Sequence, residues 1–443
     1  MSNDDSEKEK YHKFVALVLE SLYKYFVSPD FLFSGVFEPR HPSYIVYSQP
    51  ALFTTAMFMY LFRLKSRKQI DEFLRNEKFN EIYQKNFKCD VPSGDAVADF
   101  FEMLDISETS KLSCNAVKHL IKRKHLYPDR VFDEFFVIAV DGTGLYSFSK
   151  RHCEHCLKKK IGDKTIYYHY VLEAKLISRI GEFSVASVFV ENENEDVEKQ
   201  DCETKAFYRL AEQLKERFPK TKILLTFDGL YAKGPVFSIC EKYHWKYMAI
   251  LKDGSIPNLT REFEALLGLE PENCRTFSCS ESGIVQKISW ENEIPYQDTK
   301  KNNHKVSILD CLEKKLGKET HWRWVVNFTI TPKNCHEIAN KGGRLRWRLE
   351  DAFNTQKNRG FNLEHQYSRD PEGAKVFYYV LQIAHILSYL IEEEKRLKEW
   401  FPKKFSSAEV LFRKILEAFR NYSSLEAIMN YAGIARLSLL NTS

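Results

Sequence analysis

The sequence predicts an α/β fold, a mixed sheet flanked by helices behind a helical N-terminal part. Residues 10–130 carry apolar side chains that recur every three or four positions, as in amphipathic helices. From residue 131 the pattern changes to short β-rich runs that alternate with helical stretches. Two of those runs end in an aspartate followed by a glycine. Strand ends of this kind are where α/β proteins gather their sites.

The composition is that of an ordinary globular protein. The chain has 443 residues, 44% of them hydrophobic and 29% charged, which argues against general disorder. A net charge of +5 permits a nucleic-acid partner without requiring one. Residues 1–13 are polar and acidic, so we expect no secretory signal. Ten cysteines without such a signal indicate reduced thiols in a cytoplasmic protein.

The N-terminal domain is predicted to span 1–130. Its runs YHKFVALVLESLYKYF and ALFTTAMFMYLFRL have helical periodicity, and Pro39, Pro42 and Pro50 separate them. The basic, proline-containing segment 121–130 gives the boundary.

The first part of the core is predicted at 131–257. FFVIAVD, Phe135 to Asp141, has the continuous β-rich character of a buried strand. The segments that follow are predicted as strands at 165–177, 183–191, 222–228 and 246–252, and as helices at 203–218 and 235–243.

A β-rich insertion is predicted at 258–340, followed by the second part of the core at 341–394 and a helical tail at 395–443. A helix begins after Gly342 and Gly343 and carries RWRLEDAFNTQKNRGF. The apolar run from Val376 to Ile391 is short for a membrane span and contains His385, so it predicts a buried helix and no membrane partner.

Three acidic residues are candidates for a metal site. Asp141 and Asp228 end two predicted strands, and Glu350 lies on the helix after the insertion. Carboxylates that converge repel each other unless cations lie among them, and their hard oxygen ligands suit Mg²⁺ or Mn²⁺. Two such ions can activate the attacking oxygen and stabilise the leaving oxygen in phosphodiester chemistry. Taken singly, each aspartate is also a common turn former, and Glu350 a common solvated helix residue.

The combination resembles the DDE transposases of bacterial insertion sequences. VDGTG supplies Asp141, LLTFDGLYAKGPVF supplies Asp228, and the spacing of Arg346, Glu350 and Lys357 matches a Tyr-x2-Arg-x3-Glu-x6-Lys signature. GFNLEHQYSRDPEGAK and the apolar run after it are also similar to that family. The resemblance covers roughly residues 131–390 and implies a ribonuclease-H-like core. One departure is Gly343, which stands where the signature has tyrosine and puts a hairpin intermediate in doubt.

The resemblance also implies an activity. Metal-dependent cleavage at the transposon ends would be followed by attack of the freed 3′-hydroxyl on target DNA. Asp141, Asp228 and Glu350 would hold two Mg²⁺ or Mn²⁺ ions, and Arg346 and Lys357 would grip the phosphate backbone. The partners would be the terminal inverted repeats and target DNA, bound by a homodimer associated with the nucleoid. By position, the N-terminal domain would bind the DNA ends.

A second set of residues has the spacing of a zinc site. RHCEHCLKKK contains Cys153-x2-Cys156, and His169 and Cys202 are the candidates for two further ligands of a structural zinc ion. His152 and His155 are interleaved with the cysteines. In the alternative interpretation the cysteines are reduced thiols in a loop, and Lys158, Lys159 and Lys160 bind DNA.

Two further functions fit the same residues. A metal-dependent nuclease of this fold would cut DNA without strand transfer, and a transposase-derived protein without catalysis would only bind DNA. A third interpretation is an α/β protein whose acidic residues form turns. Joined DNA products distinguish the transposase from all three.

Overall fold

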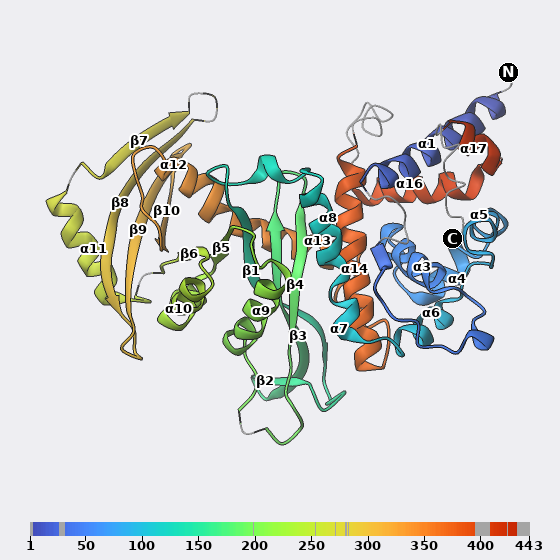
Figure 1. Cartoon of the computed structure of the whole chain (residues 1–443), viewed down its shortest axis with the longest axis horizontal. Coiled ribbons are helices and arrows are strands. Elements are labelled where there is room, and N and C mark those ends of the chain that lie inside the picture. The colour runs from blue at the N-terminus through green and yellow to red at the C-terminus, as the bar shows by residue number, and fades with distance from the viewer. Residues whose placement is uncertain are drawn as a thin grey trace.

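The computed structural model describes residues 3–25, 32–197, 199–252, 254–270, 272–279, 281, 283–394, 408–422 and 424–431. Figure 1 shows an elongated molecule with helices at one end, a central sheet, and a curved continuation of that sheet at the other end. The predicted helical tail lies partly outside the described residues, at 395–407 and 432–443.

The central sheet confirms the predicted mixed α/β fold. Its strands lie in the order β4-β3-β1-β5-β6, with antiparallel pairing from β4 to β1 and parallel pairing from β1 to β6. These strands are β1 (Phe136–Phe148), β3 (Lys164–Ile177), β4 (Glu182–Val190), β5 (Ile223–Phe227) and β6 (Lys246–Ile250). The crossover helices are α9 (Glu203–Arg217) and α10 (Gly234–Lys242), and the turn η3 (Gly229–Tyr231) follows β5.

The prediction that the first strand ends at Asp141 is wrong. Strand β1 continues to Phe148 because its antiparallel partner β3 pairs with it as far as Phe148. Only the parallel pairing with β5 stops at Val140, directly before Asp141. Asp141 therefore lies inside a long strand, at the point where that strand loses one of its two neighbours.

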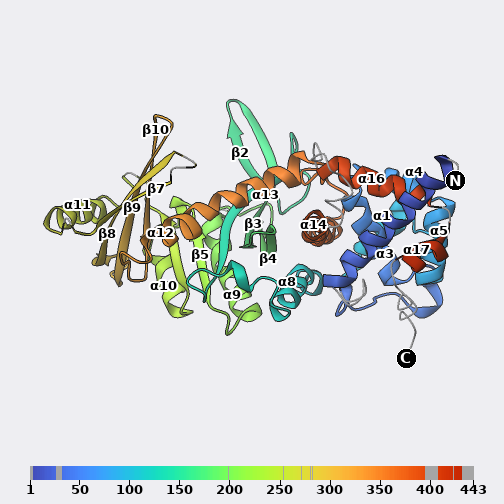
Figure 2. The same ribbon diagram turned by 90° about the horizontal axis from the view of Figure 1, so that it is seen from above.

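The lysines Lys158 to Lys160 lie in a strand, β2 (Leu157–Ile161), and not in a loop as predicted. Strand β2 forms a hairpin with the start of β3, and its three lysines are exposed. The hairpin stands out from the body of the protein (Figure 2).

The insertion extends the central sheet and forms no separate unit. It contains α11 (Pro257–Leu269), β7 (Cys274–Cys279), β8 (Ile284–Gln297), β9 (Asn303–Lys315) and β10 (Lys318–Val326). Strand β10 pairs antiparallel with β6, and the order continues β10-β9-β8-β7. The four strands agree with the predicted β-rich character of this segment, whereas helix α11 was not predicted.

A helical unit gathers both ends of the described chain. It contains α1 (Asn3–Tyr25), η1 (Pro42–Tyr44), α3 (Gln49–Leu61), α4 (Arg67–Phe73), α5 (Glu77–Phe87), α6 (Gly94–Phe101), α7 (Ile106–Thr109), α8 (Leu112–Lys122), η2 (Tyr127–Asp129), α16 (Ala408–Asn421) and α17 (Leu425–Tyr431). Helices α16 and α17 pack on α1, so the blue and red ends of the chain lie side by side (Figure 1).

Helix α14 (Pro371–Glu392) joins the helical unit to the sheet. It packs on α3 and α8 and also on β4, within one hydrophobic cluster that runs from Phe14 to Ile428. Its length and composition would suit a membrane span, but 89% of its apolar window is buried inside the protein. The prediction of a buried core helix is confirmed.

Candidate active site

Asp141 and Asp228 are neighbours because of the sheet register. Val140 of β1 pairs with Phe227 of β5, and each aspartate follows its strand residue directly. Both acids therefore lie where the parallel pairing of β1 with β5 stops.

Glu350 reaches this edge on α13 (Trp347–Asn358). The buried residues Leu349 and Phe353 of this helix pack in one cluster with Val137 and Leu224 of the sheet. At the other end of α13, the side-chain amide of Gln356 donates to Gln382 of α14 at 2.8 Å. These contacts fix the helix so that its first turn, which carries Glu350, faces the strand ends.

Arg346 links two of the three acids. It ends the short turn η5 (Gly343–Arg346) and is only 3% exposed. Its Nη1 donates to Asp141 Oδ2 at 3.0 Å, and its Nη2 donates to Glu350 Oε1 at 2.7 Å. The guanidinium therefore offsets the repulsion between these two carboxylates.

Asp228 has a different cation. Lys252, just beyond β6, donates from Nζ to Asp228 Oδ2 at 3.0 Å. Burial acts to raise the pKa of Asp228, but hydrogen bonds from Gly229 and Lys252 and the charges of Lys252 and Arg346 together lower it. Asp228 is thus held in its ionised form.

Asp141 lies in a more acidic environment. Burial is the main cause that raises the pKa of Asp141 to about 6; the Gly142 amide and Arg346 oppose the rise, and Glu203 and Glu350 add to it. One buried guanidinium thus faces several acids. This excess of carboxylate oxygen fits a divalent cation with hard ligands.

Glu203 was missed in the sequence. It occupies the first turn of α9, where its two carboxylate oxygens accept hydrogen bonds from Tyr170 at 2.7 Å and from Tyr231 at 3.0 Å. Nothing in its local sequence distinguishes it from the other glutamates, because its closeness to Asp141 arises only from the packing of α9 on the sheet.

The structure does not bring the carboxylate oxygens of the three predicted acids within the distance of a shared metal ion. Within the described residues, one group of three or more His, Cys, Asp or Glu side chains has ligand atoms that all lie within 4.8 Å of one another. That group is His152, Cys153 and His169, and it does not include the three acids. In this arrangement Arg346 and Lys252 serve as the counter-charges of the carboxylates.

Two side chains predicted to bind phosphate are paired with acids in this structure. Lys357 does not share a pairing with Glu350, because its Nζ lies 2.8 Å from Glu364 in the segment after α13. Arg346 is engaged by Asp141 and Glu350, so its guanidinium does not present a free face to phosphate.

The packing around position 343 explains why a glycine stands there. A Cβ atom built on Gly343 would lie 2.4 Å from the indole of Trp324, far inside van der Waals contact. Trp324 is 1% exposed and lies on β10 of the insertion. The indole therefore fills the space beside the backbone position where the signature has tyrosine.

Three of the four residues predicted to bind zinc lie close together. The Sγ atoms of Cys153 and Cys156 lie 3.5 Å apart, and each lies 3.4 Å from Nε2 of His169. Cys202, a predicted ligand, instead occupies the N-cap position of α9 and lies outside the cluster. His152 takes part in its place.

Residues 197–387 match the family model of the transposase DDE domain. This chain carries a transposase DDE domain. The match contains Asp228 and Glu350 and ends within α14. The mixed sheet of the protein, with helices on its faces, is consistent with a ribonuclease-H-like transposase fold. A search of curated proteins finds no match. Asp141 precedes the matched segment of the transposase, and the pairing of β1 with β5 brings it to the same site.

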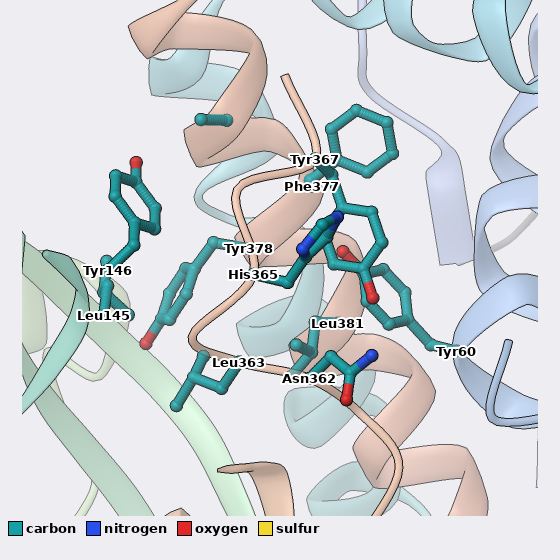
Figure 3. Close-up of a pocket in the computed structure, with 11 residues that line it drawn as sticks. Tyr60, Leu145, Tyr146, Asn362, Leu363, His365, Tyr367, Phe377, Tyr378 and Leu381 are labelled. Carbon is teal, nitrogen blue, oxygen red and sulfur yellow. The ribbon is translucent and has the colours of Figure 1, made fainter. Parts of the chain in front are cut away.

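The cavity in Figure 3 is separate from this site. It lies where Tyr60 of α3, Tyr146 of β1 and Tyr378 of α14 meet. Its volume of about 20 Å³ is room for roughly one water molecule. We therefore regard it as a packing gap of the transposase between the helical unit and the sheet.

Proposed function

We propose that this transposase cuts DNA at the ends of a bacterial insertion sequence and joins the freed 3′-hydroxyl to target DNA. The supporting observation is that Asp141 and Asp228 directly follow the paired residues Val140 and Phe227, with Glu350 linked to Asp141 through Arg346. The membership of this chain in the Tyr-x2-Arg-x3-Glu-x6-Lys branch is part of the same proposal.

Asp141, Asp228 and Glu350 are the residues that would hold the divalent ions. Bound Mg²⁺ or Mn²⁺, two ions in this proposal, would activate the attacking oxygen and stabilise the leaving oxygen of the phosphodiester. The carboxylate excess around Asp141 supports such a site. Arg346 acts as a positioning residue that orients Asp141 and Glu350, and the 60% exposed Lys252 side chain is placed to meet a phosphate beside Asp228.

The two proposed steps, cleavage and joining, need no energy source. In the first step a water oxygen attacks phosphorus, the bond from phosphorus to the 3′ oxygen breaks, and that oxygen gains a proton. In the second step the 3′-hydroxyl loses its proton as it attacks a phosphorus of the target, and the target's own 3′ oxygen leaves. The first step breaks one phosphodiester, and the second step breaks one and forms one, with a proton taken up by the leaving 3′ oxygen of the target.

The surfaces for DNA are distributed over several elements. The exposed lysines Lys158, Lys159 and Lys160 of β2 would contact the phosphate backbone. Lys357 would do so after release from Glu364. The helical unit would hold the terminal inverted repeats, and a homodimer would bring two ends together, in the cytoplasm at the nucleoid.

The test uses DNA with the element's own ends, incubated with Mg²⁺ or Mn²⁺ or with a chelator. Asp141→Asn, Asp228→Asn and Glu350→Gln should each lower cleavage and joining at least about a hundredfold, or roughly 2.7 kcal/mol of transition-state stabilisation. The matched control is Asp351→Asn, which removes the exposed acid next to Glu350 and should retain activity.

The products separate the alternatives. Metal-dependent cuts together with joined products, lost in the three variants, support the proposal. Cuts without joined products indicate a nuclease, and DNA binding with neither product indicates a DNA-binding protein without catalysis. Equal activity of wild type and Glu350→Gln would contradict the role of Glu350.

A further inference from the structure

We propose that His152, Cys153, Cys156 and His169 bind one structural zinc ion at the base of the β2–β3 hairpin. The ion would be separate from the metal at the carboxylates. Its binding does not depend on the proposed transposition reaction.

The distances fit one tetrahedral ion. Zinc bonds of about 2.3 Å to sulfur and about 2.0 Å to nitrogen place tetrahedral ligand atoms roughly 3.3–3.8 Å apart. The Sγ atoms of Cys153 and Cys156 are 3.5 Å apart, and His169 Nε2 is 3.4 Å from both. Three side chains from two separate segments thus already have the spacing that a shared ion requires.

His152 supplies the fourth ligand. One of its ring nitrogens lies within 4.8 Å of the ligand atoms of Cys153 and His169. Its ring stacks on Phe148, the last residue of β1, with the ring centroids 4.4 Å apart. His155 is a poorer candidate because it does not belong to this group of close ligand atoms.

The chemistry of the ligands favours zinc over magnesium. Two thiolates and two imidazoles make a closed four-coordinate set, the usual form of a structural zinc site. Mg²⁺ and Mn²⁺ prefer the oxygen ligands at Asp141, Asp228 and Glu350. The chain therefore offers two sites that select different metals.

The surroundings hold this cluster in place. Asn192, just after β4, donates from its side-chain amide to the carbonyl of Cys156 at 2.9 Å. The ring of Tyr146 in β1 packs on His169, with centroids 4.8 Å apart. Strands β1, β3 and β4 thus all meet the cysteine segment.

The position of the cluster indicates its role. Cys156 directly precedes β2, and His169 lies on β3, the partner strand of β2. An ion shared by these residues would cross-link the segment after β1 to β3 and fix the base of the hairpin that carries Lys158 to Lys160. The hairpin's contact with DNA rests on the proposed function.

The experiment measures zinc in the full chain, purified without a metal-affinity tag and with its thiols kept reduced. We expect about one zinc ion per chain by elemental analysis, and a tetrahedral cobalt–thiolate spectrum after exchange for Co²⁺. Cys156→Ser and His169→Asn should each remove most of the zinc. Cys202→Ser and His155→Asn are the matched controls and should keep it.

The variant His152→Ala distinguishes a loss of zinc binding from a general loss of folding. His152 is exposed, so His152→Ala should leave the circular dichroism spectrum unchanged while zinc transfers to a chelator at least about tenfold faster. Zinc content at background level in the wild type, or unchanged in Cys156→Ser, would overturn the proposal. Zinc loss in Cys202→Ser with none in His152→Ala would overturn this ligand set.

The outcome is distinguishable from a failure of the proposed function. Asp141→Asn with Glu350→Gln should abolish DNA cleavage and leave the zinc content at one ion. Zinc lost from this double variant would place the ion at the carboxylates and contradict the inference.

Discussion

Arg346 occupies the place between Asp141 and Glu350 where a divalent cation would find its ligands. Both contacts use the guanidinium, which is buried among groups that would repel each other without it. A metal ion at the proposed site would therefore compete with this side chain for carboxylate oxygens. Arg346 is the counter-charge that links the two acids in this structure.

Replacement of Arg346 tests this competition. Arg346→Ala should lower the melting temperature in chelator, because it removes a buried cation that pairs with two partly exposed carboxylates. The rise in melting temperature on addition of Mg²⁺ should be larger than in the wild type, because the carboxylates have lost their competitor.

The control for that experiment is Arg344→Ala. Arg344 pairs with Glu313 at 2.7 Å, away from the three acids. Its replacement should leave the Mg²⁺-dependent rise as in the wild type. An unchanged rise in Arg346→Ala would argue against shared ligand oxygens.

At the scale of secondary-structure elements, β10 packs against the residues that precede α13. Trp324 of the insertion covers Gly343, so a strand of the insertion limits the size of the residue that can precede α13. Gly343→Tyr should destabilise the protein by at least about 2 kcal/mol through overpacking. The same change in a Trp324→Ala background should cost less by about 1–3 kcal/mol, as expected for residues in contact.

Urea unfolding of the four proteins in this cycle supplies the measurement. Gly268→Tyr is the control, since Gly268 in α11 has open space around its Cβ position. An equal cost of Gly343→Tyr in both backgrounds would show that the indole does not exclude the tyrosine.

The β2 strand provides a second prediction at this scale. Side chains alternate along a strand, so Lys158 and Lys160 share a face and Lys159 faces the other way. All three lysines are exposed, but the ammonium of Lys159 lies 4.9 Å from the ring centre of Tyr168. We therefore expect Lys158 and Lys160 to make the phosphate contacts.

The salt dependence of DNA binding measures these contacts. Replacement of Lys158 and Lys160 by alanine should reduce the slope of log K against log salt by about 1.8, since each phosphate contact contributes about 0.9. Lys159→Ala should barely change it and serves as the control in the same strand. A larger effect of Lys159→Ala would reverse the assigned face.

At the scale of the whole molecule, the helical unit and the catalytic sheet share one core. The hydrophobic cluster is continuous from Phe14 to Ile428, and α14 contacts both parts. Lys175 of β3 donates to Gln382 of α14 at 2.7 Å across the same interface. The proposed division into a DNA-end-binding domain and a core therefore concerns function, whereas stability is shared.

Shared stability predicts that a change in the helical unit reaches the sheet. Phe53 of α3 is fully buried, so Phe53→Ala should cost about 3–5 kcal/mol. The six tryptophans all follow residue 240, so their fluorescence reports on the other part of the chain. The unfolding midpoint from that fluorescence should fall in Phe53→Ala. Tyr44→Ala, at a position 79% exposed, should leave it unchanged, and no shift in Phe53→Ala would indicate independent domains.

The sequence by itself determined the features that depend on local pattern. The β-rich runs predicted the core strands, the periodicity predicted the helices, and the spacing of Arg346 and Glu350 on one turn predicted their contact, which the structure has at 2.7 Å. Asp141 and Asp228 could be predicted as site residues because each directly follows an apolar run in the sequence.

Only the tertiary structure decided which distant residues meet. Glu203 approaches Asp141 through the packing of α9, and Trp324 reaches Gly343 through the pairing of β10 with β6. His152, and not Cys202, lies in one group with Cys153 and His169. Each of these contacts depends on strand register or helix packing between segments far apart in the chain. A local sequence pattern does not predict such contacts, because the residues on either side of a position do not depend on which distant segment packs against it.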